Sequence, residues 1–223
     1  MPGTARRRCA VSVAAALATL AFVGTAGADR EKIRLTTAGQ QAARANVVTR
    51  ADLGTAGVWK GGARKPSPDS TSSCPGFDPK LSDLVINGEA ETRWQSSGIQ
   101  IVSEADVLET ERMLRLEWRR TVLAPQFLRC LRTGVRKQST STARLVSVEH
   151  IAFPKLARYT AAFRVLIDVK TATGKVRVMS DLVFFGAGRT GLSLLVSAPL
   201  AASAVVRQAE VRLVTLLVSR IQL

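Results

Sequence analysis

Residues 161–185 read AAFRVLIDVKTATGKVRVMSDLVFF, and this stretch decides the fold. Phe163, Val165, Ile167 and Val169 face one way and Arg164, Asp168 and Lys170 face the other, at the two-residue period of a half-buried strand. The segment TATG at 171–174 has turn composition, and a second strand pattern follows at 175–185. Because a short turn joins the two runs, the sequence predicts an antiparallel hairpin here.

The position of the turn determines which residues of this hairpin face one another. With Ala172 and Thr173 at the tip, three cross-strand pairs join charged residues. These pairs are Arg164 with Asp181, Asp168 with Arg177, and Lys170 with Lys175. Opposite charges directly across two strands stabilise a register, whereas like charges oppose it. Two pairs therefore favour this register, and one counts against it.

Outside the hairpin, the chain contains further strand-like runs and several helical runs. The strand runs are 84–94, 99–107, 143–153, 161–170, 175–185 and 191–197, and the helical runs are 37–48, 109–122, 126–137 and 201–221. Residues 60–73, rich in Gly, Pro and Ser, indicate a loop. Segregated helices and mostly hairpin-linked strands predict an α+β fold, with an antiparallel sheet of about six strands flanked by helices.

The last run predicts a long helix that lies against the sheet. It has no interior Gly or Pro, and its apolar residues recur at helical spacing. The expected buried stripe consists of Ala202, Val205, Val206, Ala209, Leu213, Leu216 and Leu217. We expect this helix to be structural and not to bind membranes.

The N-terminus has the three parts of a secretory signal peptide. Three arginines at 6–8 precede an uncharged apolar run at 10–23, and AGA at 26–28 supplies the small residues of a cleavage site. A retained membrane anchor is the alternative, but a spanning helix needs roughly 20 apolar residues and this run is shorter. We therefore expect residues 1–28 to be a signal peptide and 29–223 to form one secreted or cell-envelope domain.

Two cysteines remain after such a cleavage. Cys74 and Cys130 would then be an even pair in an oxidising compartment, which predicts a disulfide bond. The bond would close a loop whose two ends lie 56 residues apart. Two free buried thiols are the alternative.

The chain is strongly basic. Its net charge is +15, and removal of residues 1–28, with three arginines and no acid, leaves +12. An exported basic protein favours anionic envelope polymers, lipid headgroups or acidic proteins, and nucleic acid is not expected outside the cell. Alternatively, the preponderance of Arg over Lys reflects only the codon usage of a GC-rich genome.

Arginine recurs with the same spacing on two consecutive helical runs. The positions are Arg112, Arg115 and Arg119, and then Arg129, Arg132 and Arg136. A spacing of i, i+3, i+7 places each set on one helix face, and guanidinium groups bind phosphates and carboxylates with paired hydrogen bonds. We expect an anion-binding surface if the helices lie side by side. Two separate solvated faces are the alternative.

Several familiar chemistries have no basis in the sequence. His150 is the only histidine, which excludes sites with several histidine ligands, and no G-x-S-x-G or Walker A pattern occurs. We expect Gly186-Ala187-Gly188 to be a hairpin turn and not a phosphate-binding loop. We expect His150 to be an ordinary strand residue, and we expect no metal, no cofactor and no catalytic residue.

Acidic residues alternate on two predicted strands. Glu89 and Glu91 share one strand face, and so do Glu104 and Asp106. Two suitably spaced carboxylates can act as acid and base. Alternating charges on a strand are more often its solvated face, and this is our expectation.

The order of elements resembles the PsbP-like α/β/α sandwich, especially exported actinobacterial versions such as envelope lipoproteins and extracellular sensor domains of kinases. The residues that carry the resemblance are 51–54 (ADLG), Trp59, Cys74, the 107–118 strand-to-helix junction, Cys130 and the helix at 201–221. The chain departs from these relatives because it has no kinase domain, no spanning helix and no lipid-accepting cysteine. The resemblance implies a domain that binds or docks and does not catalyse.

Two functional hypotheses follow. The first is a non-catalytic exported cell-envelope domain that binds an anionic ligand, polymer, lipid or protein partner. The second is a small cofactor-independent enzyme that uses the strand carboxylates.

Overall fold

The computed structural model describes residues 29–55, 57–66 and 74–221. The predicted signal peptide therefore lies outside the described residues. In the described part, the chain forms a mixed sheet of eight strands and four α-helices, so the fold is α+β as expected. The strands are β1 (Lys32–Ile33), β2 (Lys60–Arg64), β3 (Val85–Ser96), β4 (Ile99–Leu108), β5 (Ala143–His150), β6 (Tyr159–Thr171), β7 (Gly174–Ala187) and β8 (Thr190–Pro199). The helices are α1 (Thr37–Ala45), α2 (Glu111–Arg120), α3 (Phe127–Lys137) and α4 (Ser203–Ile221).

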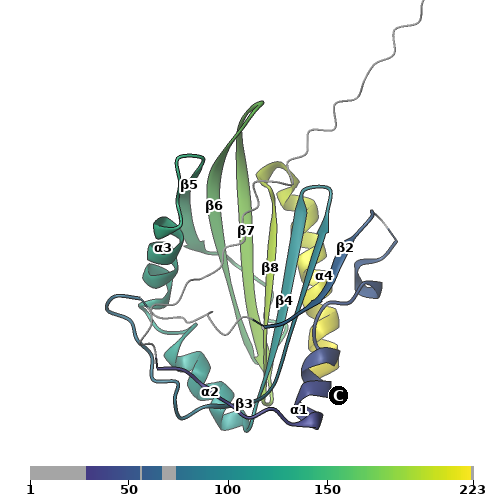
Figure 1. Ribbon diagram of the computed structural model, residues 1–223, viewed down its shortest axis with the longest axis vertical. Coiled ribbons are helices and arrows are strands. Elements are labelled where there is room, and N and C mark those ends of the chain that lie inside the picture. The colour runs from purple at the N-terminus through teal and green to yellow at the C-terminus, as the bar shows by residue number, and fades with distance from the viewer. Residues whose placement is uncertain (1–28, 56, 67–73, 222–223) are drawn as a thin grey trace, which may run out of the picture.

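The sheet order is β1-β3-β4-β8-β7-β6-β5, and β2 also pairs with β3 (Figure 1). The pair β1–β3 is parallel and the other pairs are antiparallel. The β6–β7 hairpin has the predicted register, including Arg164 opposite Asp181 and Lys170 opposite Lys175. The run at 143–153 ends as a strand earlier than expected, at His150.

The sequence pattern predicted about six strands, whereas the sheet has eight. The two strands that it did not predict are β1 and β2. β1 has two residues, too few for any alternation to show. β2 contains Gly61 and Gly62, which indicated a loop. Gly61 has φ +139°, and a Cβ there would lie 1.9 Å from the Arg93 carbonyl oxygen. Here glycine permits a close approach of β2 to β3, and does not end a strand.

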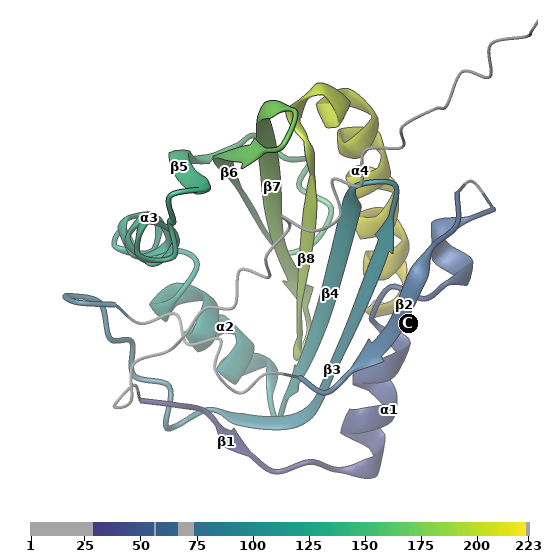
Figure 2. The same ribbon diagram turned by 45° about the horizontal axis from the view of Figure 1, so that its top comes forward.

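Helices cover both faces of the sheet (Figure 2). The adjacent residues Phe184 and Phe185 point to opposite faces, and each belongs to a different apolar cluster. The first cluster packs α1 and α4 on one face, with Leu194 and Leu213 at its centre. The second packs α2 and α3 against the other face. The protein therefore has two cores that share one sheet.

The long last helix forms as predicted and buries Val206, Leu213 and Leu217 of the predicted stripe, but its buried face is shifted around the helix. A short 3₁₀ helix, Leu200–Ala202, precedes α4. The buried residues of α4 are Val206, Glu210, Leu213, Val214, Leu217 and Val218, while Val205 is 68% exposed. Because apolar residues extend around the helix beyond the predicted stripe, periodicity gave its orientation only approximately.

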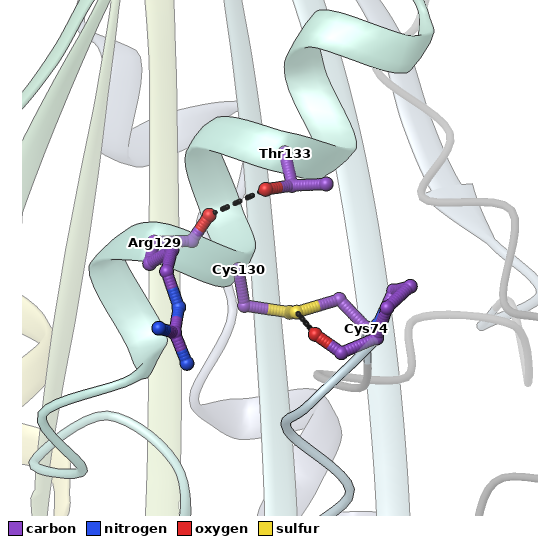
Figure 3. Close-up of a disulfide and its surroundings, with 5 residues drawn as sticks. Cys74, Arg129, Cys130 and Thr133 are labelled. Carbon is purple, nitrogen blue, oxygen red and sulfur yellow. Dashed lines mark hydrogen bonds between the residues drawn. A yellow bond between two sulfur atoms is a disulfide. The ribbon is translucent and has the colours of Figure 1, made fainter.

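The disulfide forms as the cysteine count predicts. Cys74 and Cys130 are bonded, with their Cα atoms 5.5 Å apart (Figure 3). The bond joins the segment before β3 to α3, which lies beside β5 at the other edge of the sheet. It therefore ties together parts of the chain that belong to opposite edges of the sheet.

Candidate functional site

The arginines of α2 and α3 lie on the outer surfaces of these helices. Thr110 caps α2, its hydroxyl accepting a hydrogen bond from the Met113 amide. The helix turns Leu114 and Trp118 into the core, which leaves its arginine positions outward. All six predicted residues, Arg112, Arg115, Arg119, Arg129, Arg132 and Arg136, are exposed.

None of these six arginines forms an ion pair with the described residues, and the same holds for other exposed basic residues such as Arg44 and Arg212. By contrast, the basic side chains that do form one are Arg93, Arg120, Arg158, Arg164, Lys175, Arg177, Arg207 and Arg220. The α2 and α3 arginines are therefore a set of uncompensated positive charges.

The acids of these helices cannot neutralise them. Glu111 is paired with Arg158, and Glu117 turns towards the sheet, where its Oε2 is buried. Helix α3 has no acidic residue at all. Neither Glu111 nor Glu117 therefore offsets the charge of these arginines, because one is already bonded and the other faces inward.

The two arginine stripes are adjacent but not parallel. Figure 2 shows α3 nearly end-on while α2 runs across the view, so the helix axes cross steeply. Arg132 donates from Nη2 to the Val148 carbonyl oxygen at 2.9 Å, which directs it towards β5. The arginines are thus spread over two adjoining surfaces. A large or flexible anionic partner suits such a spread better than a single small ion.

The same face of the sheet carries the predicted carboxylates, and the structure brings them together. Glu89 lies opposite Asp106, and Glu91 lies opposite Glu104. None of the four is exposed, and Glu91 is only 5% exposed. The expectation of a solvated strand face is therefore wrong. The sequence of one strand shows that its acids alternate. It does not show that a neighbouring strand and a helix cover those acids in the folded protein.

Few groups compensate these carboxylates. Arg93 lies 3.2 Å from Glu91, and the Ser193 hydroxyl donates to Glu104 at 2.8 Å. Burial and the charges of Glu104, Glu31 and Glu89 raise the pKa of Asp106 to about 8. Burial also raises the pKa of Glu104.

Glu117 joins this cluster from α2. Its Oε2 would lie 3.9 Å from a Cβ at Gly191, the residue paired with Asp106 on β8. Burial first, and then the charge of Asp106, raise the pKa of Glu117 well above its usual range. Asp106 is therefore mainly protonated at neutral pH, and the cluster carries less negative charge than its number of acids indicates.

The remaining predicted features are structural. His150 is exposed and contacts Phe163 edge-on, with ring centroids 5.4 Å apart. Across the part of the chain that the structure describes, no group of three His, Cys, Asp or Glu side chains could hold a metal ion. Among those same residues, no helix combines the length and apolar character that crossing a membrane requires.

Two solved structures resemble this chain. The extracellular domain of PknH from Mycobacterium tuberculosis has a TM-score of 0.39 and 9% identity, over 80% of this chain and 95% of that one. A putative uncharacterized protein (Rv0999 ortholog) from Mycobacterium smegmatis has a TM-score of 0.39 and 11% identity, over 78% and 93%. No family model matches the chain, and neither does any curated protein. The PsbP-like resemblance stays a prediction.

Proposed function

We propose that the protein is an exported, non-catalytic domain of the cell envelope that binds an anionic partner through the exposed arginines of α2 and α3. The observation that carries this proposal is the absence of any ion pair at these six arginines within the described residues. Uncompensated guanidinium groups repel one another, and an anionic polymer, membrane or acidic protein would relieve that repulsion.

Export is the second part of the proposal. Residues 1–28 have the composition of a signal peptide, and a disulfide is stable mainly in oxidising compartments. N-terminal sequencing of protein recovered outside the cytoplasm should begin near Asp29. Recovery of an intact form starting at Met1 in the membrane would contradict the cleavage.

Binding is tested with phosphatidylglycerol-containing vesicles and with a soluble anionic polysaccharide, both at low and at raised salt. We expect binding at low salt that weakens steeply as salt rises, because exposed charges are screened within about 10 Å at 0.1 M ionic strength. The double substitution Arg115→Glu with Arg129→Glu should remove most of it. Arg129 lies in the first turn of α3, where a negative charge favours the helix, so the fold should persist.

A matched control separates this surface from general charge. Arg44→Glu with Arg212→Glu changes the net charge equally, but these exposed residues lie on α1 and α4, across the sheet. The control should bind as the unsubstituted protein does. Equal loss of binding in both double variants would show that net charge alone is responsible. No binding at low salt would remove the proposal.

A further inference from the structure

A pocket of about 290 Å³ lies on the α4 side of the sheet, where α4 begins. It is lined by Ile151, Ala152, Arg164, Ser203, Ala204 and Arg207. Two of these residues are arginines, one from β6 and one from α4. The pocket is on the other side of the sheet from the arginines of α2 and α3, and it does not depend on the function proposed for them.

A group of four charged side chains forms the wall behind this pocket. Arg164 binds Asp181 through both carboxylate oxygens, at 2.7 and 2.6 Å. Arg207 lies one helical turn before Glu210, and its Nη1 is 3.6 Å from Glu210 Oε2. Asp181 and Glu210 are fully buried, whereas the arginines reach the surface with 21% and 29% of their side chains exposed. The positive groups of this cluster are therefore the ones that the pocket presents.

The hydrogen-bond requirements of Arg207 and Glu210 are not met within the described residues. Arg207 Nη1 and both carboxylate oxygens of Glu210 are buried and have no hydrogen-bond partner there. The rest of the Arg207 guanidinium is held in place, because it donates to the Ala152 carbonyl oxygen and lies 4.2 Å from the centre of the Phe153 ring. Arg207 is thus fixed in position, with its buried Nη1 turned towards Glu210 Oε2 at 3.6 Å, beyond hydrogen-bond distance. The side chain is 29% exposed, so part of the held guanidinium reaches the pocket.

The charge of this cluster depends on Glu210. Burial first, and then the charge of Asp181, raise the pKa of Glu210 to about 8, although Arg207 and Arg164 oppose this shift. At neutral pH, Glu210 is therefore mainly protonated, and two guanidinium groups face one carboxylate. The cluster then carries one net positive charge beside a pocket.

We propose that this pocket binds a small oxyanion, of the sulfate, phosphate or carboxylate type, through Arg207 with Arg164 and Ser203. Arg207 supplies the exposed part of a guanidinium that is already held in place, and an oxyanion accepts hydrogen bonds from such a group with good geometry. Ser203 adds a hydroxyl that makes no hydrogen bond with the described residues. Arg164 contributes charge from the opposite wall while it remains bonded to Asp181.

Glu210 makes this binding depend on pH. When Glu210 ionises, its charge cancels that of Arg207 and the oxyanion loses its net attraction. The charged groups that face Glu210 are Asp181 from β7, Arg164 from β6 and Arg207 from its own helix, and Glu149 of β5 lies opposite Arg164. The two arginines keep their positive charge between neutral pH and pH 9.5. The ionisation of Glu210 therefore controls the change in the net charge of the cluster. Affinity should fall as pH rises through about 8.

Sulfate is a suitable probe because its charge is constant across this range. The full mature chain is titrated with sulfate against chloride at equal ionic strength, at pH 6.5 and pH 9.5, with amide NMR shifts as the readout. We expect saturable shifts at Ala204 and Arg207 at pH 6.5, and an affinity at least tenfold lower at pH 9.5. Glu210→Gln should bind equally at both pH values, since its side chain stays neutral.

Variants identify the residue responsible. Arg207→Gln should lower sulfate affinity at least tenfold at pH 6.5, whereas Arg212→Gln, which removes an exposed charge from the same helix, should not. If Arg207→Gln does not fold, Ser203→Ala should still weaken binding several-fold. Absence of saturable shifts at pH 6.5, equal affinity in Arg207→Gln, or shifts confined to α2 and α3 would each overturn the proposal.

Discussion

Arg164 holds Asp181 across β6 and β7 with two hydrogen bonds, from Nε to Oδ1 at 2.7 Å and from Nη2 to Oδ2 at 2.6 Å. Asp181 is fully buried, so this guanidinium is its principal compensating charge. The same hairpin carries a second pair, Asp168 with Arg177, at its more exposed end. The buried pair has the greater consequence for stability, because water cannot replace its partner.

Loss of one member of this pair should destabilise the protein strongly. Asp181→Asn leaves the Arg164 charge partly buried and uncompensated, and we expect a loss of roughly 3–5 kcal/mol in the free energy of unfolding. Urea denaturation would measure it. Asp168→Asn, at the exposed end, should cost much less. Replacing both partners, as Arg164→Met with Asp181→Leu, should recover much of the loss, and a double variant as unstable as Asp181→Asn would contradict this explanation.

The disulfide should contribute substantially to stability. The double substitution Cys74→Ser with Cys130→Ser removes a constraint between residues 56 apart, and the chain-entropy model predicts a loss of about 4 kcal/mol. Thermal and urea unfolding of this variant should match those of the reduced native protein. Titration of two free thiols in the untreated folded protein would show that the bond is not formed.

Helix α4 should require its buried face for folding. Leu213 is 1% exposed, and Leu213→Asp would bury an unpaired charge at a cost of several kcal/mol. We expect insoluble or unfolded protein, judged by expression and circular dichroism. Val205→Asp on the same helix is the control, since Val205 is 68% exposed and should change stability by less than about 0.5 kcal/mol. A folded Leu213→Asp protein would mean that this face is not packed.

Stability should fall as pH rises from about 4 to 8 on account of Asp106. Folding raises the pKa of Asp106 to about 8, so over this range the folded state binds a proton that the unfolded state has released. The stabilisation is complete below the unfolded pKa and disappears as pH passes the folded one. Asp106→Asn should flatten this decline in urea midpoints measured at pH 5, 7 and 9.

Asp83 provides a control of opposite sign. Its pKa is lowered by the hydrogen bond from Arg120, so its contribution is present near neutral pH and decreases on acidification. Asp83→Asn should therefore reduce stability at pH 7 and leave the decline towards pH 9 unchanged. The explanation for Asp106 would be wrong if Asp106→Asn and the unsubstituted protein lost stability in parallel from pH 5 to pH 9.

The sequence alone determined the features that depend on local period and on counting. Alternation and a four-residue turn predicted the β6–β7 hairpin and its register, including the pairing of Arg164 with Asp181. The two cysteines left after the expected cleavage predicted the bond between Cys74 and Cys130. These features were readable because the period of a strand and the reach of a turn are properties of a short segment.

Only the tertiary structure decided which side of each element is covered. Helical period predicted part of the buried face of α4, but packing on β7 and β8 shifts that face, so that Glu210 is buried and Val205 is exposed. The acids of β3 and β4 alternate like solvated residues, yet Glu91 is buried opposite Glu104, and Asp106 lies near Glu117 of α2. Charge state follows from burial, and burial depends on neighbours far away in sequence. The protonated acids and the pocket beside Arg207 therefore exist only in the folded chain.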